Sequence, residues 1–265
     1  MSETKTPHVE LQLEHGIARL TLCNPEHRNA ITRRMWEELT QITSDLAIRR
    51  DLRVVMIRGV GPDAFASGAD ISEFGENRRS SEQAADHTAA IQEAIDGIEA
   101  IPVPVVALIH GFCIGAGTAI ALACDLRYLD NNARFGIPAA RLGIGYSPLW
   151  IKRLVDVVGR ATAGEILMTG QFLSADKALR CGFANEVVPA ADLDEFVEKQ
   201  LAVIAANAPL SVAAAKVSLR EIAAFDRDRD WQAPFAAVQA CAESSDYQSA
   251  LTAFANKQTP VFYGE

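Results

Sequence analysis

Hydrophobic and polar residues alternate along residues 9–22, and the alternation is interrupted once, at Gly16. A period of two on either side of a glycine predicts two β-strands joined as a hairpin. Beyond a turn at residues 24–29, apolar residues recur every three or four positions, which predicts a helix that Thr32 caps and that ends near Arg50. The chain therefore begins with a hairpin followed by an amphipathic helix.

Two short, uninterrupted apolar runs follow, at residues 54–57 and 105–109, and residues 126–129 predict a third short strand. Runs of this kind are typical of strands that are buried on both faces of a sheet. Helical patterns at about residues 81–100 and 118–124 separate them. The middle of the chain therefore has the order strand, helix, strand, which indicates parallel crossover units.

After about Leu149 the strand patterns almost vanish, apart from Val187-Val188, and alanine-rich helical patterns continue to Asn256. No repeat, low-complexity segment or flexible linker interrupts this part of the chain. We therefore expect an α/β fold in two parts, a core over residues 1–195 and a C-terminal helical region over residues 196–265.

The charge balance excludes several kinds of partner. The chain has 25 basic and 34 acidic residues and a net charge of −9, whereas nonspecific binding to nucleic acid or to an anionic membrane needs clustered Lys and Arg. Residues 100–124 lack charged side chains, but prolines and glycines interrupt them, which favours a buried strand and helix over a membrane span. The five cysteines have no metal-ligand spacing, and neither end of the sequence resembles a secretory or peroxisomal signal. We therefore expect reduced thiols, no metal and a cytoplasmic location.

A glycine-rich turn within residues 105–125, VVALIHGFCIGAGTAIALACD, is the strongest local sign of chemistry. It matches the dinucleotide fingerprint only in part, because Ile120 stands where the third glycine belongs, and the chain has neither a phosphate loop nor a nucleophile elbow. An oxyanion site is the better interpretation, because the first N–H groups of a helix lack helical partners and carry partial positive charge. The small residues Gly115-Ala116-Gly117 would let a substrate oxygen approach these groups.

A series of short segments resembles the crotonase, or enoyl-CoA hydratase/isomerase, superfamily over nearly the whole chain. The segments occur in order and with family-like spacing: Asn24-Pro25, Asn29-Ala30, Phe65-Ala66-Ser67-Gly68-Ala69-Asp70-Ile71, His110-Gly111, Gly115-Ala116-Gly117, Cys124-Asp125, Phe135-Gly136, Pro138, Leu142-Gly143, Leu167, Thr169-Gly170, Gly182, Val187-Val188, Phe254 and Lys257. The resemblance implies a spiral core of ββα turns, a helical trimerisation region, and a homotrimer or a dimer of trimers. It also implies an acyl-CoA substrate, with coenzyme A as part of the thioester and no tightly bound cofactor.

In that family, two backbone N–H groups bind the thioester carbonyl oxygen, and by position they fall on Ala69 and Ala116. A thioester that becomes an enolate concentrates negative charge on this oxygen, and each preorganised donor is worth about 3 kcal/mol. Both residues are alanines, so the backbone would donate and no side chain would be needed. The resemblance therefore implies a catalytic oxyanion hole at Ala69 and Ala116.

The resemblance also assigns residues to the coenzyme A moiety. The loop that begins at Ala69 is similar to the family's adenine and pantetheine wall, and Arg28 resembles the basic residue near the CoA phosphates. Two residues late in the chain resemble a clamp that a neighbouring subunit often provides. The expected CoA contacts are Arg28, Ala66, Asp70, Ile71, Ser72, Phe254 and Lys257.

The sequence departs from the family at two positions that matter for the reaction. A family hydratase has one Glu three residues after the second oxyanion position and another twenty residues further, where this chain has Ala119 and Ala139. Adding water to a conjugated double bond needs one group to deprotonate water and one to protonate carbon, and alanine does neither. Tyr146, three residues after Gly143, resembles a Tyr in the family's methylmalonyl-CoA decarboxylase and is the third catalytic candidate. Weaker candidates are Glu73, His110, Cys113 and Arg141.

These features predict an enzyme on acyl-CoA thioesters, a lyase or isomerase that stabilises an enolate and is not a standard hydratase. Methylmalonyl-CoA-type decarboxylation and double-bond isomerisation are the alternative reactions. A non-catalytic CoA-binding oligomer and a nicotinamide oxidoreductase are the alternative classes of protein. Exchange of the Cα proton in heavy water would separate an enzyme from a CoA binder.

Overall fold

The computed structural model describes residues 6–70, 73, 81–224 and 230–265. Strands β1 (His8–Glu14) and β2 (Ile17–Cys23) form the predicted antiparallel hairpin. Helix α1 (Arg33–Ala47) follows, and the hydroxyl oxygen of its N-cap Thr32 accepts a hydrogen bond from the backbone N–H of Met35 at 3.3 Å. The sequence pattern therefore predicted these elements and the cap, although the helix ends at Ala47 rather than near Arg50.

Four more strands extend the hairpin into a six-stranded sheet with the order β1-β2-β3-β5-β7-β10. They are β3 (Val54–Gly59), β5 (Val105–Ile109), β7 (Leu126–Asp130) and β10 (Glu186–Val188), and each pairing from β2 onward is parallel. The apolar runs of the sequence are thus buried parallel strands, as predicted. Alternate residues of each strand face opposite sides of the sheet and pack in two separate cores.

A second sheet of four very short strands, in the order β4-β6-β8-β9, positions the candidate site. The strands are β4 (Ala64–Ala66), β6 (Phe112–Ile114), β8 (Arg134–Gly136) and β9 (Leu173–Ser174), and β4, β6 and β8 are parallel. Each of β4, β6 and β8 follows within a few residues of β3, β5 and β7. The chain therefore repeats strand, short strand, helix, which is the ββα spiral that the resemblance implied. The sequence pattern did not predict these short strands.

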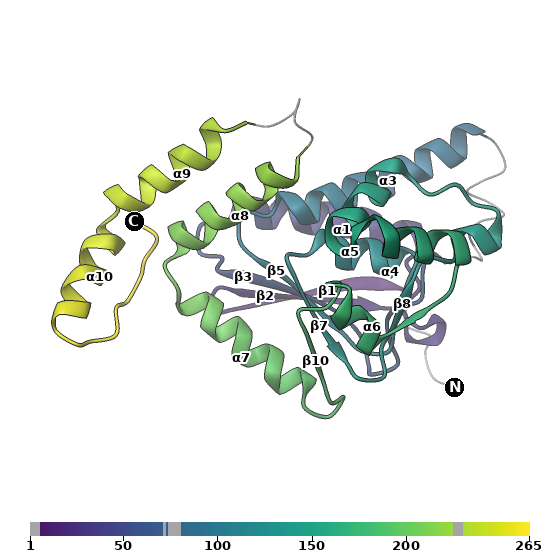
Figure 1. Cartoon of the computed structure of the whole chain (residues 1–265), viewed down its shortest axis with the longest axis horizontal. Helices are drawn as coiled ribbons and strands as arrows, with labels where there is room; N and C mark the ends of the chain where they lie inside the picture. Colours follow the sequence, from purple (N-terminus) through teal and green to yellow (C-terminus); the bar gives the residue numbers. More distant parts are fainter. Residues whose placement is uncertain (1–5, 71–72, 74–80, 225–229) are drawn as a thin grey trace.

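Helices cover both faces of the six-stranded sheet. On one side, α1 packs with α3 (Ser81–Ala100), α4 (Ala116–Ala123) and α5 (Pro148–Thr169), and on the other side α7 (Leu193–Ala206) lies against the strands (Figure 1). The short helices are η1 (Pro25–His27), η3 (Pro138–Leu142) and α6 (Ala175–Arg180). Helix α5 is broken at Gly159, whose φ of 73° and ψ of 159° are not helical.

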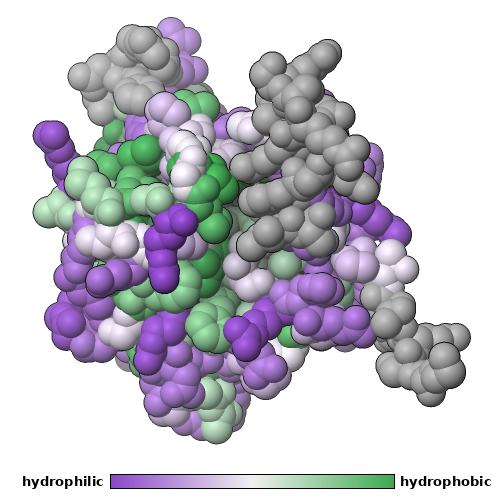
Figure 2. All heavy atoms as spheres, turned by 90° about the vertical axis from the view of Figure 1, so that its right-hand side faces the viewer, coloured by the Kyte–Doolittle hydropathy of each residue, from purple (hydrophilic) through white to green (hydrophobic). Residues whose placement is uncertain are grey.

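The last helices are α8 (Pro209–Ala223), α9 (Gln232–Glu243) and α10 (Ser245–Ala255), and α9 and α10 extend beyond the sheets as an arm over residues 230–265 (Figure 1). The opposite end of the molecule carries a strip of hydrophobic surface between hydrophilic margins (Figure 2). The predicted boundary at residue 195 falls in the first turn of α7, and the division into two domains stays a prediction.

Within the described residues, no single helix is long and apolar enough to cross a membrane, although α7 and α8, bent by 105°, pass that test of length and composition as a pair. No group of three or more His, Cys, Asp or Glu side chains among the described residues is arranged to hold a metal ion.

Candidate active site

The two turns that follow β4 and β6 meet each other at glycines. Strands β4 and β6 are parallel neighbours, with Ala66 paired to Cys113, so their carboxyl ends lie side by side. A Cβ atom on Gly115 would lie 3.7 Å from the Cα of Gly68, and both glycines have a positive φ, 54° and 124°. These conformations suit glycine, and they place the next residue of each turn, Ala69 and Ala116, on neighbouring segments.

The backbone of Ala69 is held on one side only. Residues 69 and 31 form a parallel β-bridge, in which the Ile31 N–H donates to Gly68 O at 2.8 Å and the Asp70 N–H donates to Ile31 O at 2.9 Å. In such a bridge the N–H of the residue between those two contacts points away from the partner strand. Among the described residues no hydrogen bond from the Ala69 N–H is recorded, so this donor is available to a ligand.

Ala116 begins helix α4, and its N–H is one of the first donors of that helix. The first bond of the helix runs from the Ala119 N–H to Gly115 O at 3.0 Å, so the N–H of Ala116 lies outside the helical ladder and at the positive end of the helix dipole. Gly117 allows the helix to approach β4, because a Cβ there would lie 2.5 Å from Ala66 O. The helix terminus is thereby pressed against the strand that leads to Ala69.

Strand β8 fixes the second turn from the other side. The carbonyl oxygen of Gly136 accepts the Gly115 N–H at 2.8 Å and the hydroxyl of Thr118 at 3.1 Å, and the same hydroxyl contacts Cys113 O at 2.7 Å. Thr118 is completely buried. The turn is therefore rigid before any ligand arrives, which is the condition for electrostatic stabilisation by backbone donors.

The two alanines that replace the expected carboxylates pack against the main hydrophobic core. Ala119 lies on α4 and is buried, and Ala139 lies in η3, half-buried, where its carbonyl oxygen accepts the Ile144 N–H at 3.0 Å. Neither methyl group can hold or transfer a proton. The two turns that carry Ala69 and Ala116, called the oxyanion turns for the role expected of them, keep their backbone donors, while these two positions are apolar.

Tyr146 packs against the same hydrophobic core as Ala119 and Ala139. The residue is half-buried and packs on the main core, and its ring meets the ring of Trp150 edge-on at a centroid distance of 5.2 Å. Its hydroxyl is buried and has no hydrogen-bond partner among the described residues. Burial raises the pKa of Tyr146 well above its ordinary value, although the positive charge of Arg153 acts in the opposite direction. The hydroxyl is therefore a neutral donor at physiological pH and not a base.

Comparison with known proteins agrees with this architecture. The family model described as enoyl-CoA hydratase/isomerase matches residues 12–265. The chain belongs to the enoyl-CoA hydratase/isomerase family. The crotonyl-CoA hydratase of Syntrophomonas wolfei is 31% identical, with 96% of this chain and 97% of that protein aligned. The short-chain-enoyl-CoA hydratase of Clostridium acetobutylicum is 30% identical over 95% of each chain.

Solved structures agree as well. The crystal structure of an enoyl-CoA hydratase/carnithine racemase from Magnetospirillum magneticum superposes with a TM-score of 0.92 at 33% identity and covers 97% of this chain and 96% of its own. Membership of the crotonase superfamily and the α/β fold predicted from the sequence are therefore confirmed.

Two of the residues expected to bind CoA border the oxyanion turns of this family member. Arg28 is exposed, with a left-handed φ of 51°, and its guanidinium lies 5.2 Å from the centroid of the Phe112 ring in β6. Its carbonyl oxygen accepts the Ser67 N–H at 3.0 Å, which ties it to the loop that carries Ala69. Asp70 is half-buried in that loop. Sequence reasoning missed Phe112, because the letters carry no sign of an Arg–aromatic contact between segments so far apart.

The other expected CoA contacts are placed differently. Ala66 is completely buried and faces Gly117 through its carbonyl oxygen, so its side chain is not open to a ligand. Ile71 and Ser72 lie outside the described residues, as does the side chain of Phe254. Lys257 is exposed at the end of α10, on the arm, at the far end of the molecule from α4 and β8 (Figure 1). Within one chain, Lys257 and the oxyanion turns are therefore not brought together.

The weaker candidates have other roles in the structure. Glu73 accepts the Arg33 N–H at 2.8 Å and so holds the start of α1. His110 is buried between two carboxylates. Burial raises the pKa of the Cys113 thiol far above neutrality, which leaves it protonated and unreactive. Arg141 is exposed and stacks over the Phe172 ring at 6.0 Å.

Proposed function

We propose that this protein is an acyl-CoA enzyme that forms a thioester enolate by removing carbon dioxide from a short acyl group of the methylmalonyl type. The observation that carries the proposal is the buried hydroxyl of Tyr146, which has no hydrogen-bond partner in the part of the chain that the structure describes. It occurs in a family member that has methyl groups at Ala119 and Ala139, the positions at which hydration would need carboxylates. The coenzyme A is part of the substrate, and no further cofactor is required.

Decarboxylation needs little from the protein besides an oxyanion site. The bond between Cα and the carboxylate carbon breaks, carbon dioxide leaves, and the electron pair of that bond forms the enolate. The negative charge moves to the thioester oxygen, which the N–H groups of Ala69 and Ala116 stabilise by about 3 kcal/mol each. A proton from solvent then adds at Cα and gives the product thioester. No protein base takes part in any of these steps.

Tyr146 suits this reaction because it is a neutral donor. Its hydroxyl can hold the carboxylate by one hydrogen bond and so fix the plane of the group relative to the thioester. An uncompensated cation at that place would stabilise the carboxylate more before the reaction than in the transition state, where the charge leaves it, and would slow the loss of carbon dioxide. Arg153, whose charge acts on Tyr146, is paired with Asp96 and Glu99, and these carboxylates offset its charge. The apolar methyl groups of Ala119 and Ala139 likewise give the carboxylate no solvation.

Hydration is the second candidate, because the relatives from Syntrophomonas wolfei and Clostridium acetobutylicum are both named hydratases. Hydration and double-bond isomerisation both need a group that accepts a proton. The raised pKa of Tyr146 makes it unsuitable for that task. A protein that only binds CoA is also compatible with the two alanines, and it would leave the Cα proton of an acyl-CoA unexchanged in heavy water.

We infer a homotrimer or a dimer of trimers in the cytoplasm, and the exposed side chains of the last helices support the formation of an assembly. Large apolar side chains are exposed on α8, α9, α10 and the segment after them: Leu219, Ile222, Phe235, Val238, Tyr247, Leu251, Val261 and Tyr263. Large apolar side chains left exposed in this number on neighbouring elements are typical of an interaction site. In such an assembly, Phe254 and Lys257 would contact the CoA bound to a neighbouring subunit, which accounts for the separation of Lys257 from the oxyanion turns of its own chain.

Purified protein incubated with methylmalonyl-CoA in one tube and crotonyl-CoA in another, each followed by mass spectrometry, tests the proposal. We expect loss of carbon dioxide from the first substrate and no gain of water by the second. Tyr146→Phe should lower the first rate about 100-fold. Tyr128→Phe, which removes a hydroxyl from the second core, where the ring of Tyr128 packs on Phe196 of α7, is the matched control and should leave the rate unchanged. Rapid hydration of crotonyl-CoA would overturn the proposal.

A further inference from the structure

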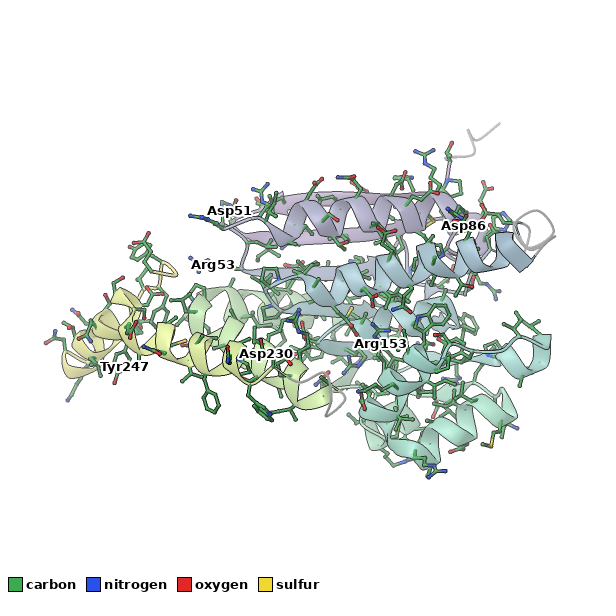
Figure 3. The ribbon with its side chains drawn as sticks, turned by 90° about the horizontal axis from the view of Figure 1, so that it is seen from above. Asp51, Arg53, Asp86, Arg153, Asp230 and Tyr247 are labelled. Atoms are coloured by element: carbon green, nitrogen blue, oxygen red, sulfur yellow. The ribbon has the colours of Figure 1, made fainter. Side chains whose placement is uncertain are left out.

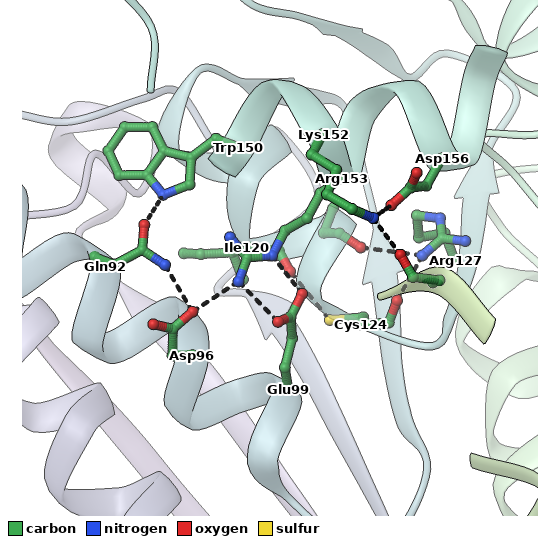
Figure 4. A network of polar contacts seen from close by, with 12 residues as sticks. Gln92, Asp96, Glu99, Ile120, Cys124, Arg127, Trp150, Lys152, Arg153 and Asp156 are labelled. Atoms are coloured by element: carbon green, nitrogen blue, oxygen red, sulfur yellow. Dashed lines mark hydrogen bonds and ion pairs between the residues drawn. The ribbon is translucent and has the colours of Figure 1, made fainter. Parts of the chain in front are cut away.

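A chain of polar side chains joins the first turns of α5 to α3 (Figure 4). The indole N–H of Trp150 donates to Gln92 Oε1 at 2.8 Å, and Gln92 Nε2 donates to Asp96 Oδ1 at 2.6 Å. Arg153 Nη2 donates to the same Asp96 oxygen at 2.7 Å and to Glu99 Oε2 at 2.7 Å, and Arg153 Nε also donates to Glu99. Gln92 is therefore held between the indole and a carboxylate.

The spacing of these residues explains why the polar contacts connect the two helices. Gln92, Asp96 and Glu99 are four and three residues apart and share one face of α3, whereas Trp150 and Arg153 are three residues apart and share one face of α5. Arg153 lies in the interior, between the helices (Figure 3), and its side chain is only 16% exposed. A guanidinium this deeply buried needs carboxylate partners, so the contacts of Arg153 with Asp96 and Glu99 hold α5 against α3. The hydrogen bond from Trp150 to Gln92 then fixes the orientation of the indole ring.

The side chain of Tyr146 contacts the indole ring of Trp150. Tyr146 lies before α5 in residues 143–147, which form no strand or helix, and it directly follows Gly145, two residues after Gly143. A Cβ on either glycine would meet nothing within 4 Å, so the backbone here is not confined by neighbours. The hydroxyl has no hydrogen-bond partner among the described residues. Besides its packing on the main core, the tyrosine ring has one aromatic contact among the described residues, the edge-on contact with Trp150 at 5.2 Å and an interplanar angle of 67°.

We propose that Trp150 and Gln92 are positioning residues for Tyr146: the hydrogen bond between them sets the indole ring, and the indole ring sets the direction of the tyrosine hydroxyl. The role in turnover rests on the function proposed above for Tyr146. Trp150 and Gln92 act through Tyr146 and do not themselves contact the substrate. A hydroxyl displaced by about 1 Å loses its alignment with the carboxylate, which can lower a rate by up to about 100-fold.

Gln92→Met tests the hydrogen bond, because methionine has a similar length but no acceptor amide, and Trp150→Phe keeps an aromatic ring while it removes the N–H. For both variants we expect kcat on methylmalonyl-CoA to fall about 10-fold, with KM within about twofold. Gln239→Met is the matched control. Gln239 makes the corresponding contact on α9, donating to Glu243 at 2.7 Å, and its loss should change neither constant.

A double-mutant cycle separates positioning from a loss of structure. In a Tyr146→Phe background, Gln92→Met should cause no further fall in kcat, because its effect passes through the hydroxyl that is already gone. If the two losses multiply instead, Gln92 acts on the enzyme by another route and the proposal is wrong.

A spectroscopic test does not depend on activity. The chain has four tyrosines, and the 13Cζ signal that disappears in Tyr146→Phe belongs to Tyr146. We expect Gln92→Met and Trp150→Phe to shift or broaden that signal and to leave the other three in place. An unchanged Tyr146 signal in both variants would overturn the positioning role. If the signal shifts but Tyr146→Phe has full activity, the positioning stands and the proposed function falls.

Discussion

Two buried polar side chains of this protein, His110 and Tyr146, differ in what surrounds them. His110 follows β5, and its ring contacts Asp130 through Nδ1 at 3.0 Å and Asp194 through Nε2 at 2.8 Å. The hydroxyl of Tyr146 has no such partner among the described residues. His110 links β5 to β7 and to α7, which Asp194 and Arg58 hold to the sheet. A satisfied group of this kind stabilises the fold.

An unsatisfied group has the opposite effect. A buried donor without an acceptor costs about 1–3 kcal/mol of stability, and folded proteins keep few of them, at functional or strained positions or where water supplies the acceptor. The N–H groups of the half-buried Ala69 and Ala116 resemble the Tyr146 hydroxyl in that no hydrogen bond from them lies within the described residues. The comparison therefore predicts two kinds of variant: those that lose stability and keep activity, and those that lose activity and keep stability.

The largest effect on activity is expected for Ala116→Pro. Proline is tolerated as the first residue of a helix, where the missing N–H has no helical partner, so the fold should persist while one oxyanion donor is lost. We expect kcat on methylmalonyl-CoA to fall by about 10²–10³-fold, with thermal unfolding unchanged. Ala116→Ser retains the N–H and is the control. Full activity of the proline variant would show that Ala116 is not a donor.

The largest effect on stability is expected for His110→Phe. The change keeps the ring and removes both nitrogens, so Asp130, which is 2% exposed, loses its side-chain partner. We expect the free energy of unfolding, measured with urea at pH 6, to fall by about 3 kcal/mol. The kcat of the folded variant should remain unchanged. Equal stability of the variant and the wild type would mean that His110 is not the structural tie described above.

These contrasts also show how far the sequence alone could lead. The apolar runs predicted β3 and β5, because an uninterrupted hydrophobic strand is typically buried within the sheet of an α/β protein, and β7 was predicted as a third short strand although it contains Arg127. The three-residue strands β4, β6 and β8 have no such pattern. Their pairing depends on parallel neighbours far apart in the sequence and on the turn at Gly111, where a Cβ would lie 2.0 Å from Asp63 O.

The candidate site likewise has one part that the sequence predicted and one part that it did not. The small residues Gly115-Ala116-Gly117 indicated a helix terminus that a ligand can approach, and the family resemblance then assigned the two backbone donors to Ala69 and Ala116. The packing between α3 and α5 determines the surroundings of Tyr146. It produces the contact of Tyr146 with Trp150 and the hydrogen bond from Trp150 to Gln92. No spacing rule encodes such contacts, so the sequence could name Tyr146 only by resemblance.

A smaller effect is expected when pH changes the charge on His110. The hydrogen bond with Asp130 raises the pKa of His110, burial opposes it, and Asp194 adds to it. The stability from this shift is therefore complete below the unfolded pKa of about 6.5 and is lost as pH rises through the folded pKa. The difference in unfolding free energy between wild type and His110→Phe should shrink from pH 6 to pH 9. A constant difference would contradict the assignment of the shift to His110.

The pair of His110 and Asp130 also makes the free energy of unfolding depend on pH in acid. Burial alone would raise the pKa of Asp130, but the hydrogen bonds from His110 and from the N–H groups of Gly111 and Asn132 lower it. Its contribution is therefore present above the unfolded pKa of about 3.9 and is lost as pH falls through the lowered folded value. The urea series extended to pH 3 should show this second loss, and His110→Phe should weaken it.

The smallest expected effect is the most direct test of the comparison. Tyr146→Phe removes a buried hydroxyl that has no partner among the described residues, so no protein hydrogen bond is broken and a desolvated polar group disappears. We expect the unfolding free energy to stay the same or to rise by up to about 1 kcal/mol, whereas the corresponding change at His110 lowers it. A loss of 2 kcal/mol or more would mean that the hydroxyl is satisfied in solution, by an ordered water for example. Tyr146 would then belong with His110 among the groups that hold the fold.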